Sequence, residues 1–222
     1  MAIDVSKAAA LPGVKAIATW ENTPRVLFNT SATMTFTSPH QEPVLDQYIF
    51  DNVVRYVGDE VAAVAATSEA IAAEAVKRIQ VTYEELPYVL DPLEAMEEAA
   101  PEIHPCQAGK NIPGEVVRLG MGDFHSGFAQ SDVTFSGMVK VPIQKQAQME
   151  THAAVAQWQP DGGLTVWSTT QTPHPSKMIL AHVFDMPQSK VRVANPPYVG
   201  GGFGVRIGFL TPKTHRVILP AC

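Results

Sequence analysis

The first half of the chain carries one clear succession of hydrophobic patterns, within residues 53–92. Residues 61–66 are a short apolar run, which predicts a buried strand. Ser68 and Glu69 then begin a helical pattern, because they supply a capping side chain and an acidic group at the positive end of the helix dipole. Alternation within residues 81–83 predicts a returning strand. This order predicts a βαβ-like unit covering one face of a sheet. The apolar face of the helix is predicted to consist of Ile71, Ala75, Val76 and Ile79.

The second half shows patterns of both kinds. Alternating apolar residues predict three strands, a turn rich in glycine predicts a hairpin between the second and third, and two prolines in a first turn predict a helix. A short fourth strand precedes a run of glycines. In chain order, the predicted elements are a strand at 133–141, a hairpin of 154–158 and 164–168 around Pro160 to Gly163, a helix at 173–184 and a strand at Val191 and Val193.

Between these halves, glutamates are interleaved with prolines and glycines over residues 92–122, which predicts a linker or an extended wrapping segment. We therefore predict three parts: a domain at 1–95, a linker at 96–122 and a second domain at 123–222. Helices and strands occur in both domains, so the expected fold class is α+β.

Composition narrows the function classes. The 222 residues carry a net charge of -6, which disfavours a nucleic-acid partner because phosphate binding needs clustered Lys and Arg. No apolar stretch is long enough to span a membrane, and the first residues lack the pattern of a signal peptide. Cys106 and Cys222 are too far apart for a CxxC site, so a reducing, cytoplasmic setting is expected.

The first candidate site is the glycine run Gly200-Gly201-Gly202-Phe203-Gly204. Consecutive glycines permit unusual backbone angles and let main-chain N–H groups approach an anion or a metal-bound oxygen closely. The spacing matches neither a dinucleotide-binding motif nor a P-loop. Taken alone, a glycine-rich turn is the simpler interpretation.

The second candidate is the polar segment from Gln144 to His152. Its glutamine amides suit hydrogen bonding to an oxo or hydroxo ligand, and Glu150 and His152 suit acid–base roles. A polar surface segment between two strands is the competing interpretation. The other histidines lack the spacing of zinc ligands.

Four blocks taken together resemble the xanthine dehydrogenase/aldehyde oxidase family. Residues 55–64 with 79–87 resemble the a/b hammerhead domain of that family, and residues 149–154 resemble the start of its molybdopterin-binding region. Residues 164–171 and the segment from Lys190 to the glycine run resemble the next two blocks. The resemblance covers the chain up to about Gly208.

The resemblance implies a molybdenum hydroxylase, in which a pterin-held molybdenum ion carries the reaction and protein groups bind and orient it. By motif position, Gln144 matches the glutamine that hydrogen-bonds an oxygen ligand of molybdenum. Gly202, Phe203 and Gly204 match the loop whose backbone N–H groups face the cofactor. Iron–sulfur clusters and FAD are expected only on partner subunits or domains, and the substrate is a small molecule that the sequence does not specify.

The chain departs from the family pattern at both of its ends, and the family segments without a counterpart here are expected to be missing. The family has further hammerhead strands before the position of Met1 and several hundred residues after the glycine loop, including a second cofactor-binding domain and the glutamate that acts as general base. The tail at 209–222 resembles nothing in the family, so we expect a truncation. No catalytic residue is assigned, and Glu150 is not given the role of base.

Three functions remain open. The chain is part of a hydroxylase subunit that works with the rest of the cofactor subunit, or a non-catalytic remnant that binds no cofactor and at most pairs with partner subunits. A free-standing small-molecule binding module built on the βαβ unit ranks last, because only composition supports it.

Overall fold

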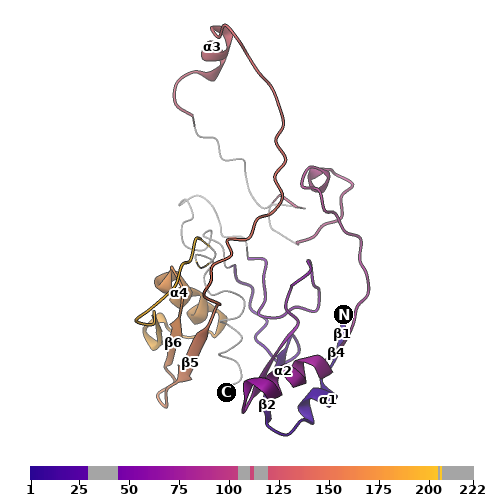
Figure 1. Ribbon diagram of the computed structural model, residues 1–222, viewed down its shortest axis with the longest axis vertical. Helices are drawn as coiled ribbons and strands as arrows, with labels where there is room; N and C mark the ends of the chain where they lie inside the picture. Colours follow the sequence, from indigo (N-terminus) through magenta and orange to yellow (C-terminus); the bar gives the residue numbers. More distant parts are fainter. Residues whose placement is uncertain (30–44, 105–110, 113–119, 205, 207–222) are drawn as a thin grey trace.

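The computed structural model describes residues 1–29, 45–104, 111–112, 120–204 and 206. Helices and strands occur in both halves of the described chain, which confirms the expected α+β class (Figure 1). The tail at 209–222 lies outside the described residues, as do Cys106, Cys222 and Gly208. The predicted division at residues 95 and 122 stays a prediction.

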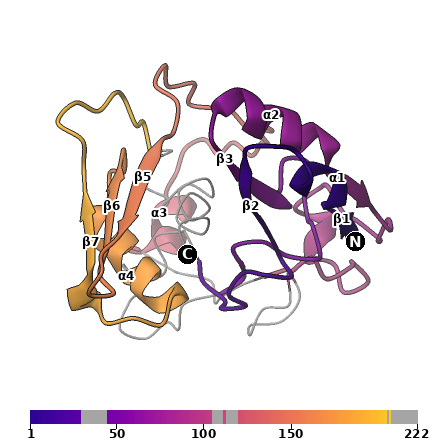
Figure 2. The same ribbon diagram turned by 90° about the horizontal axis from the view of Figure 1, so that it is seen from below.

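The N-terminal half consists of two small antiparallel sheets beside two helices. One sheet pairs β1 with β4, and the other pairs β2 with β3 through an irregularity between Val14 and Ala16. Helices α1 and α2 pack against each other and against the sheet of β2 and β3 (Figure 2). The elements are β1 (Ala2–Asp4), α1 (Ser6–Ala9), β2 (Val14–Thr19), β3 (Ala62–Ala66), α2 (Glu69–Arg78) and β4 (Gln80–Thr82).

Helix α2 begins as the sequence predicts, because the Ser68 side chain accepts a hydrogen bond from the Ile71 N–H. Ala75 is fully buried on the predicted face. Val76 was wrongly placed there, since it is 54% exposed. It lies next to Ala75 in sequence, about 100° further around the helix, and so at the margin of the buried stripe.

The predicted βαβ unit is wrong in its pairing. Strands β3 and β4 flank α2 as expected, but β3 pairs with β2 and β4 pairs with β1, so the two strands belong to different sheets. The prediction failed because the partner strands β1 and β2 lie at residues 2–19, before the segment from which the unit was predicted. This pairing leaves the hypothesis of a binding module built on one βαβ sheet without its structural basis.

The C-terminal half is a three-stranded sheet packed on one helix, and its hairpin, helix and last strand lie where the sequence predicts them. Strands β5 and β6 form the expected hairpin, and Gly162 in its turn has a φ of 79°. Strand β7 lies parallel to β6, and α4 makes the crossover between them. The elements are β5 (Ala154–Trp158), β6 (Leu164–Ser168), α4 (Pro173–Val183), the 3-10 helix η3 (Gln188–Lys190) and β7 (Val191–Ala194).

A shared core joins the two halves. Ile179 and Val183 of α4 are buried in one cluster with Ala18, Phe28 and Phe50 of the N-terminal half. The other face of α4 packs on the sheet, where Leu180 and Ala181 contact Leu164, Val166 and Val191. A ring nitrogen of His182 also lies 2.9 Å from the Leu27 carbonyl oxygen. Helix α4 is therefore covered on both sides.

A long arm, defined here as the described residues 120–147, projects from this body with α3 (Phe124–Ala129) near its far end (Figure 1). The strand predicted at 133–141 is wrong, since this segment is extended but pairs with no strand in the described part of the chain. Its alternating pattern is present, but no strand among the described residues lies beside it. In the linker before the arm, η2 (Glu94–Met96) is a single 3-10 turn.

Candidate functional site

The glycine loop, residues 200–204, is fastened at its start by Glu150. The segment after β7 curves back across the end of the sheet toward the segment that leads into β5 (yellow and orange in Figure 2). There the Gly200 N–H donates to the Glu150 carboxylate. A Cβ atom on Gly200 would lie only 2.6 Å from Glu150 Oε2, so this close approach requires glycine. The structure thus brings two of the sequence blocks together.

The end of the loop is fastened by Gln171, which follows β6. The Gly204 N–H donates to Gln171 Oε1 at 3.2 Å. A Cβ atom on Gly202 would lie 2.7 Å from Gln171 Cδ, so a larger residue at that position would displace the Gln171 side chain. The loop therefore rests on two side chains at the same end of the sheet, because β5 and β6 are antiparallel and Ala154 at the start of β5 pairs with Ser168 at the end of β6.

The middle of the loop has an unusual backbone. Phe203 has a φ of 47°, in the left-handed region that disfavours a bulky residue by roughly 1–2 kcal/mol. Phe203 is 72% exposed, so burial of its side chain does not explain this conformation. Within the described residues, the N–H groups of Gly201, Gly202 and Phe203 donate to no protein acceptor. A strained turn with available N–H groups suits the binding of an anion or of an oxygen ligand.

Arg206, directly beyond the loop, holds Glu150 in place. Its side chain is 1% exposed, and Nη1 lies 2.8 Å from Glu150 Oε2 while Nη2 donates to the Glu150 carbonyl oxygen at 3.0 Å. These guanidinium bonds, with the Gly200 N–H, lower the pKa of the Glu150 carboxyl from its usual value. Glu150 is thereby kept ionised, and its carboxylate is engaged in holding the loop.

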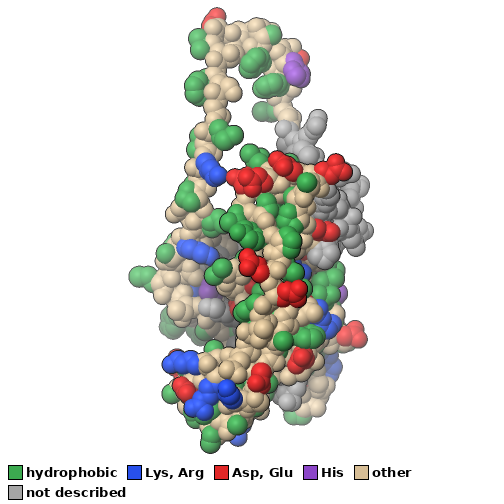
Figure 3. All heavy atoms as spheres, turned by 90° about the vertical axis from the view of Figure 1, so that its right-hand side faces the viewer, with side chains coloured by type: hydrophobic (Ala, Val, Ile, Leu, Met, Phe, Trp, Pro, Cys, Tyr) green, Lys and Arg blue, Asp and Glu red, His purple; other side chains and the backbone are tan. Residues whose placement is uncertain are grey.

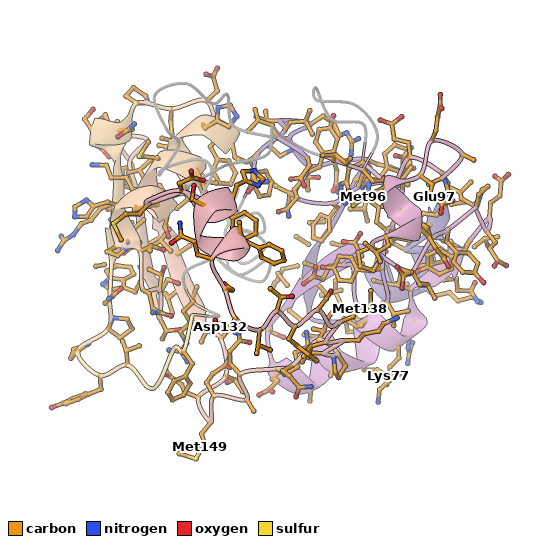
Figure 4. The ribbon with its side chains drawn as sticks, turned by 90° about the horizontal axis from the view of Figure 1, so that it is seen from above. Lys77, Met96, Glu97, Asp132, Met138 and Met149 are labelled. Atoms are coloured by element: carbon orange, nitrogen blue, oxygen red, sulfur yellow. The ribbon has the colours of Figure 1, made fainter. Side chains whose placement is uncertain are left out.

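The segment that carries Gln144 is exposed and has its own backbone irregularity. Among the described residues, the Gln144 amide donates only to the nearby Pro142 carbonyl oxygen, at 3.4 Å. Ala147 has a φ of 51°, so both candidate segments contain a non-glycine residue in the left-handed region. Further along, the Gln148 amide lies 2.9 Å from a ring nitrogen of His152. Met149, labelled in Figure 4, points outward from the same stretch.

No hydrogen bond joins Gln144 to the glycine loop within the described residues. Gln144 and Glu150 are six positions apart, and of these two only Glu150 hydrogen-bonds to the loop among the described residues. The convergence of Gln144 and Phe203 on one ligand therefore stays a prediction.

Sequence reasoning missed Gln171 and Arg206 as loop-holding residues. Gln171 ends one of the recognised blocks and Arg206 follows the glycines by two positions, but neither position has a periodic signal. The described residues contain no group of three or more His, Cys, Asp or Glu side chains placed to hold a metal ion. They also include no helix that is long and apolar enough to span a membrane.

Two sequence profiles match the chain over consecutive ranges. Residues 1–87 match the a/b hammerhead domain of aldehyde oxidase and xanthine dehydrogenase, and residues 103–221 match the molybdopterin cofactor-binding domain. The chain belongs to the xanthine dehydrogenase family. This confirms the resemblance drawn from the four blocks. The second match extends to residue 221, beyond the point near Gly208 where the sequence resemblance was expected to end.

Relatives within the xanthine dehydrogenase family are much longer proteins. The xanthine dehydrogenase molybdenum-binding subunit of Escherichia coli O157:H7 is 31% identical over 92% of this chain and 26% of its own length. The carbon monoxide dehydrogenase large chain of Hydrogenophaga pseudoflava is 33% identical over 90% of this chain and 26% of its own. The chain thus spans about a quarter of the length of these relatives.

A solved structure of the family shares this fold. The aldehyde oxidoreductase from Desulfovibrio gigas superposes with a TM-score of 0.81 at 28% identity, covering 100% of this chain and 24% of that one. The order of elements, with two small sheets followed by a three-stranded sheet and its helix, is therefore an arrangement found within the xanthine dehydrogenase family.

Proposed function

We propose that this chain forms part of the molybdopterin-binding subunit of a molybdenum hydroxylase, which hydroxylates an electron-poor carbon of a small molecule with oxygen derived from water. The glycine loop carries this proposal, because it presents on a strained turn three N–H groups that donate to no acceptor among the described residues. The substrate is an N-heterocycle or an aldehyde. Electrons leave through iron–sulfur and FAD groups on partner subunits or domains.

The chemistry of the loop fits the cofactor. A molybdopterin group carries anionic and oxygen-bearing ligands, which main-chain N–H groups on a left-handed turn are suited to bind. Gln144 is exposed and its amide makes one long local bond within the described part of the chain, so it is available to donate to an oxygen ligand. When bound, the cofactor supplies a redox centre able to accept two electrons from the substrate.

The chain's own residues have separate tasks in this proposal. Gln144 and the Phe203 main chain orient the cofactor, while Glu150, Gln171 and Arg206 hold the loop that presents the N–H groups. Glu150 does not act as the base, because its carboxylate accepts from Arg206 and Gly200 and its pKa is lowered. The whole reaction requires protein beyond these residues.

Molybdenum content tests the proposal. The chain is purified together with its partner subunits, and molybdenum is measured per mole of chain for the wild type, Gln144→Ala and Gln146→Ala. Loss of a hydrogen bond to a charged group weakens binding by about tenfold or more, so Gln144→Ala is expected to retain far less metal. Gln146→Ala, a neighbouring exposed glutamine, is the matched control and is expected to retain the wild-type amount.

Two outcomes would contradict the proposal. Metal-free wild-type protein, both alone and with its partners, would favour the alternative of a non-catalytic remnant that only pairs with other subunits. Equal loss of metal in both glutamine variants would remove the specific role of Gln144.

A further inference from the structure

Buried hydroxyl groups gather where β6 ends and α4 begins. Burial of a hydroxyl costs free energy unless the group is hydrogen-bonded, so such a cluster calls for a reason. Gln171, which holds the end of the glycine loop, lies between the strand and the helix at this point. The exposed fractions are 4% for Ser168, 7% for Thr169, 5% for Thr170 and 0% for Ser176.

The Thr170 hydroxyl closes a tight turn around Gln171. Its Oγ1 accepts a hydrogen bond from the Thr172 N–H at 3.1 Å, which folds the chain back over two residues. Ser176 Oγ and the Arg206 carbonyl oxygen each lie 3.4 Å from the same oxygen. The hydroxyl therefore sets the direction in which β6 passes into α4, and with it the position of Gln171.

The start of α4 has few other groups to fix it. Pro173 and Pro175 lie in the first turn and have no N–H group. A capping side chain usually accepts from the second or third helical N–H, and only His174 offers one here. Within the described chain, the Thr172 side chain makes no capping hydrogen bond to the helix. The bond from Thr170 thus substitutes for a helix cap.

Gln171 contacts the end of the glycine loop through two separate bonds. Its main-chain N–H donates to the Arg206 carbonyl oxygen at 3.0 Å, and its side-chain Oε1 accepts from the Gly204 N–H at 3.2 Å. Both bonds depend on the backbone direction of Gln171, which the turn sets. A shift of the turn therefore disturbs both bonds together and loosens the end of the loop.

A ligand of the loop depends on well-aimed donors rather than on general attraction. The protein carries a net charge of -6, and Asp and Glu side chains are spread over much of the face shown in Figure 3. An anionic group gains nothing from such a surface, and a hydrogen bond weakens steeply when its donor is misaligned. The position of the loop N–H groups therefore decides how well they bind.

We propose that Thr170 is a positioning residue of the glycine loop: its buried hydroxyl fixes Gln171 and, through Gln171, the N–H groups that receive the ligand. Thr170 acts on the loop without contacting it directly. The inference rests on the proposed function, because the ligand of the loop is taken to be the molybdopterin cofactor.

Hydrogen exchange followed by mass spectrometry tests the position of the loop itself. Thr170→Val puts a methyl group in place of the hydroxyl and removes this acceptor of the Thr172 N–H. Loss of a buried hydrogen bond changes an equilibrium by about tenfold, and loops exchange through local opening, so the peptide containing residues 200–204 is expected to exchange about tenfold faster. Thr170→Ser keeps the hydroxyl and is expected to exchange at the wild-type rate.

Three further variants separate the turn from general effects. Ser68→Ala loses a bond of the same kind at the start of α2, so it controls for lost stability and is expected to leave loop exchange unchanged. Thr169→Val makes the same change at the neighbouring buried position and is also expected to have no effect. Thr170→Ala removes the hydroxyl without adding a methyl group, and it is expected to reproduce the effect of Thr170→Val. Circular dichroism confirms that each variant is folded.

Molybdenum and pterin are measured per mole of chain on the same proteins, purified with their partner subunits. Thr170→Val is expected to retain about tenfold less of both, whereas Ser68→Ala is expected to retain the wild-type amounts. Unchanged loop exchange in Thr170→Val, or equal acceleration in Ser68→Ala, would overturn the positioning role. Faster loop exchange with undiminished cofactor would overturn it as well. Faster exchange in Thr170→Val combined with a cofactor-free wild type would count against the proposed function alone.

Discussion

Glu150 and Arg206 are unequally buried, and this inequality sets the effect of removing each one. Arg206 is 1% exposed and Glu150 is 35% exposed. Replacing Glu150 leaves a buried guanidinium group without its carboxylate, whereas replacing Arg206 leaves a carboxylate that can reach water. Glu150→Gln is therefore expected to lower the free energy of unfolding more than Arg206→Met, as measured by urea titration at pH 7. The reverse order would show that the pair does not hold the loop in this way.

The same pair gives a defined dependence on pH. The Arg206 bond, followed by the Gly200 N–H, lowers the pKa of Glu150 in the folded state below its usual value of 4.5. The folded state therefore gains stability at pH values above 4.5 and loses it as the pH falls through the lowered folded pKa. The difference in urea midpoint between wild type and Glu150→Gln is expected to be full at pH 7 and to shrink in acid. A difference that grows below pH 4.5 would contradict this sign.

Close approach at Gly200 predicts a steric effect on stability. An added Cβ would meet Glu150 Oε2 at 2.6 Å and Glu150 Cβ at 2.8 Å. Overpacking of this kind typically costs about 1–3 kcal/mol, so Gly200→Ala is expected to destabilise the protein by that amount in thermal or urea unfolding. Gly120→Ala is the control, because no atom of the described residues lies within 4 Å of its Cβ position. Equal effects of the two substitutions would argue against the contact with Glu150.

The sequence revealed the glycine loop but not the side chains that hold it. Consecutive glycines are visible in any reading of the chain, whereas Glu150 and Gly200 are 50 residues apart and their contact leaves no local pattern. The left-handed backbone of Phe203 was equally hidden, because aromatic residues rarely adopt it. The family resemblance pointed to Phe203 as part of the loop that faces the cofactor, but its left-handed backbone is visible only in the structure.

Helix α2 shows how far local signals extend. Its capping residue, first acidic residue and buried Ala75 all follow from neighbouring sequence, and the structure confirms them. Strand 133–141 shows the limit, because alternation specifies a face but cannot specify which strand lies beside it. The pairing of β3 and β4 failed for the same reason.

The Ser68 cap is expected to contribute measurably to stability. Loss of its bond to the Ile71 N–H in Ser68→Ala is expected to lower the free energy of unfolding by about 0.5–2 kcal/mol. Ser68→Asp retains an acceptor and adds a negative charge at the positive helix end, so it is expected to stay close to wild type. Urea titration of the three proteins decides the matter, and equal losses in both variants would exclude a capping effect.

The two halves of the molecule are joined through α4. Ile179 is fully buried with Phe28 and Phe50 of the N-terminal half. Ile179→Ala is expected to cost about 2–5 kcal/mol, because it leaves a cavity in a core that both halves share. Urea unfolding of the variant and the wild type measures this difference.

A shared core also predicts one unfolding transition for both halves. Trp20 reports on the N-terminal half, and Trp158, which packs edge-on against Phe184, reports on the sheet. Fluorescence of Trp20→Phe and of a Trp158→Phe, Trp167→Phe double variant follows each half by itself. Coincident midpoints are expected, and two separated transitions would show that the halves unfold independently.

The two residues that fix the start of the glycine loop are far apart in sequence. Glu150 precedes β5 and Arg206 follows β7, so the whole three-stranded sheet lies between them along the chain. The loop therefore keeps its shape only while the segments before β5 and after β7 stay together. Any change that loosens the sheet also releases the loop and its N–H groups, even when the changed residue lies far from Gly200 and Phe203.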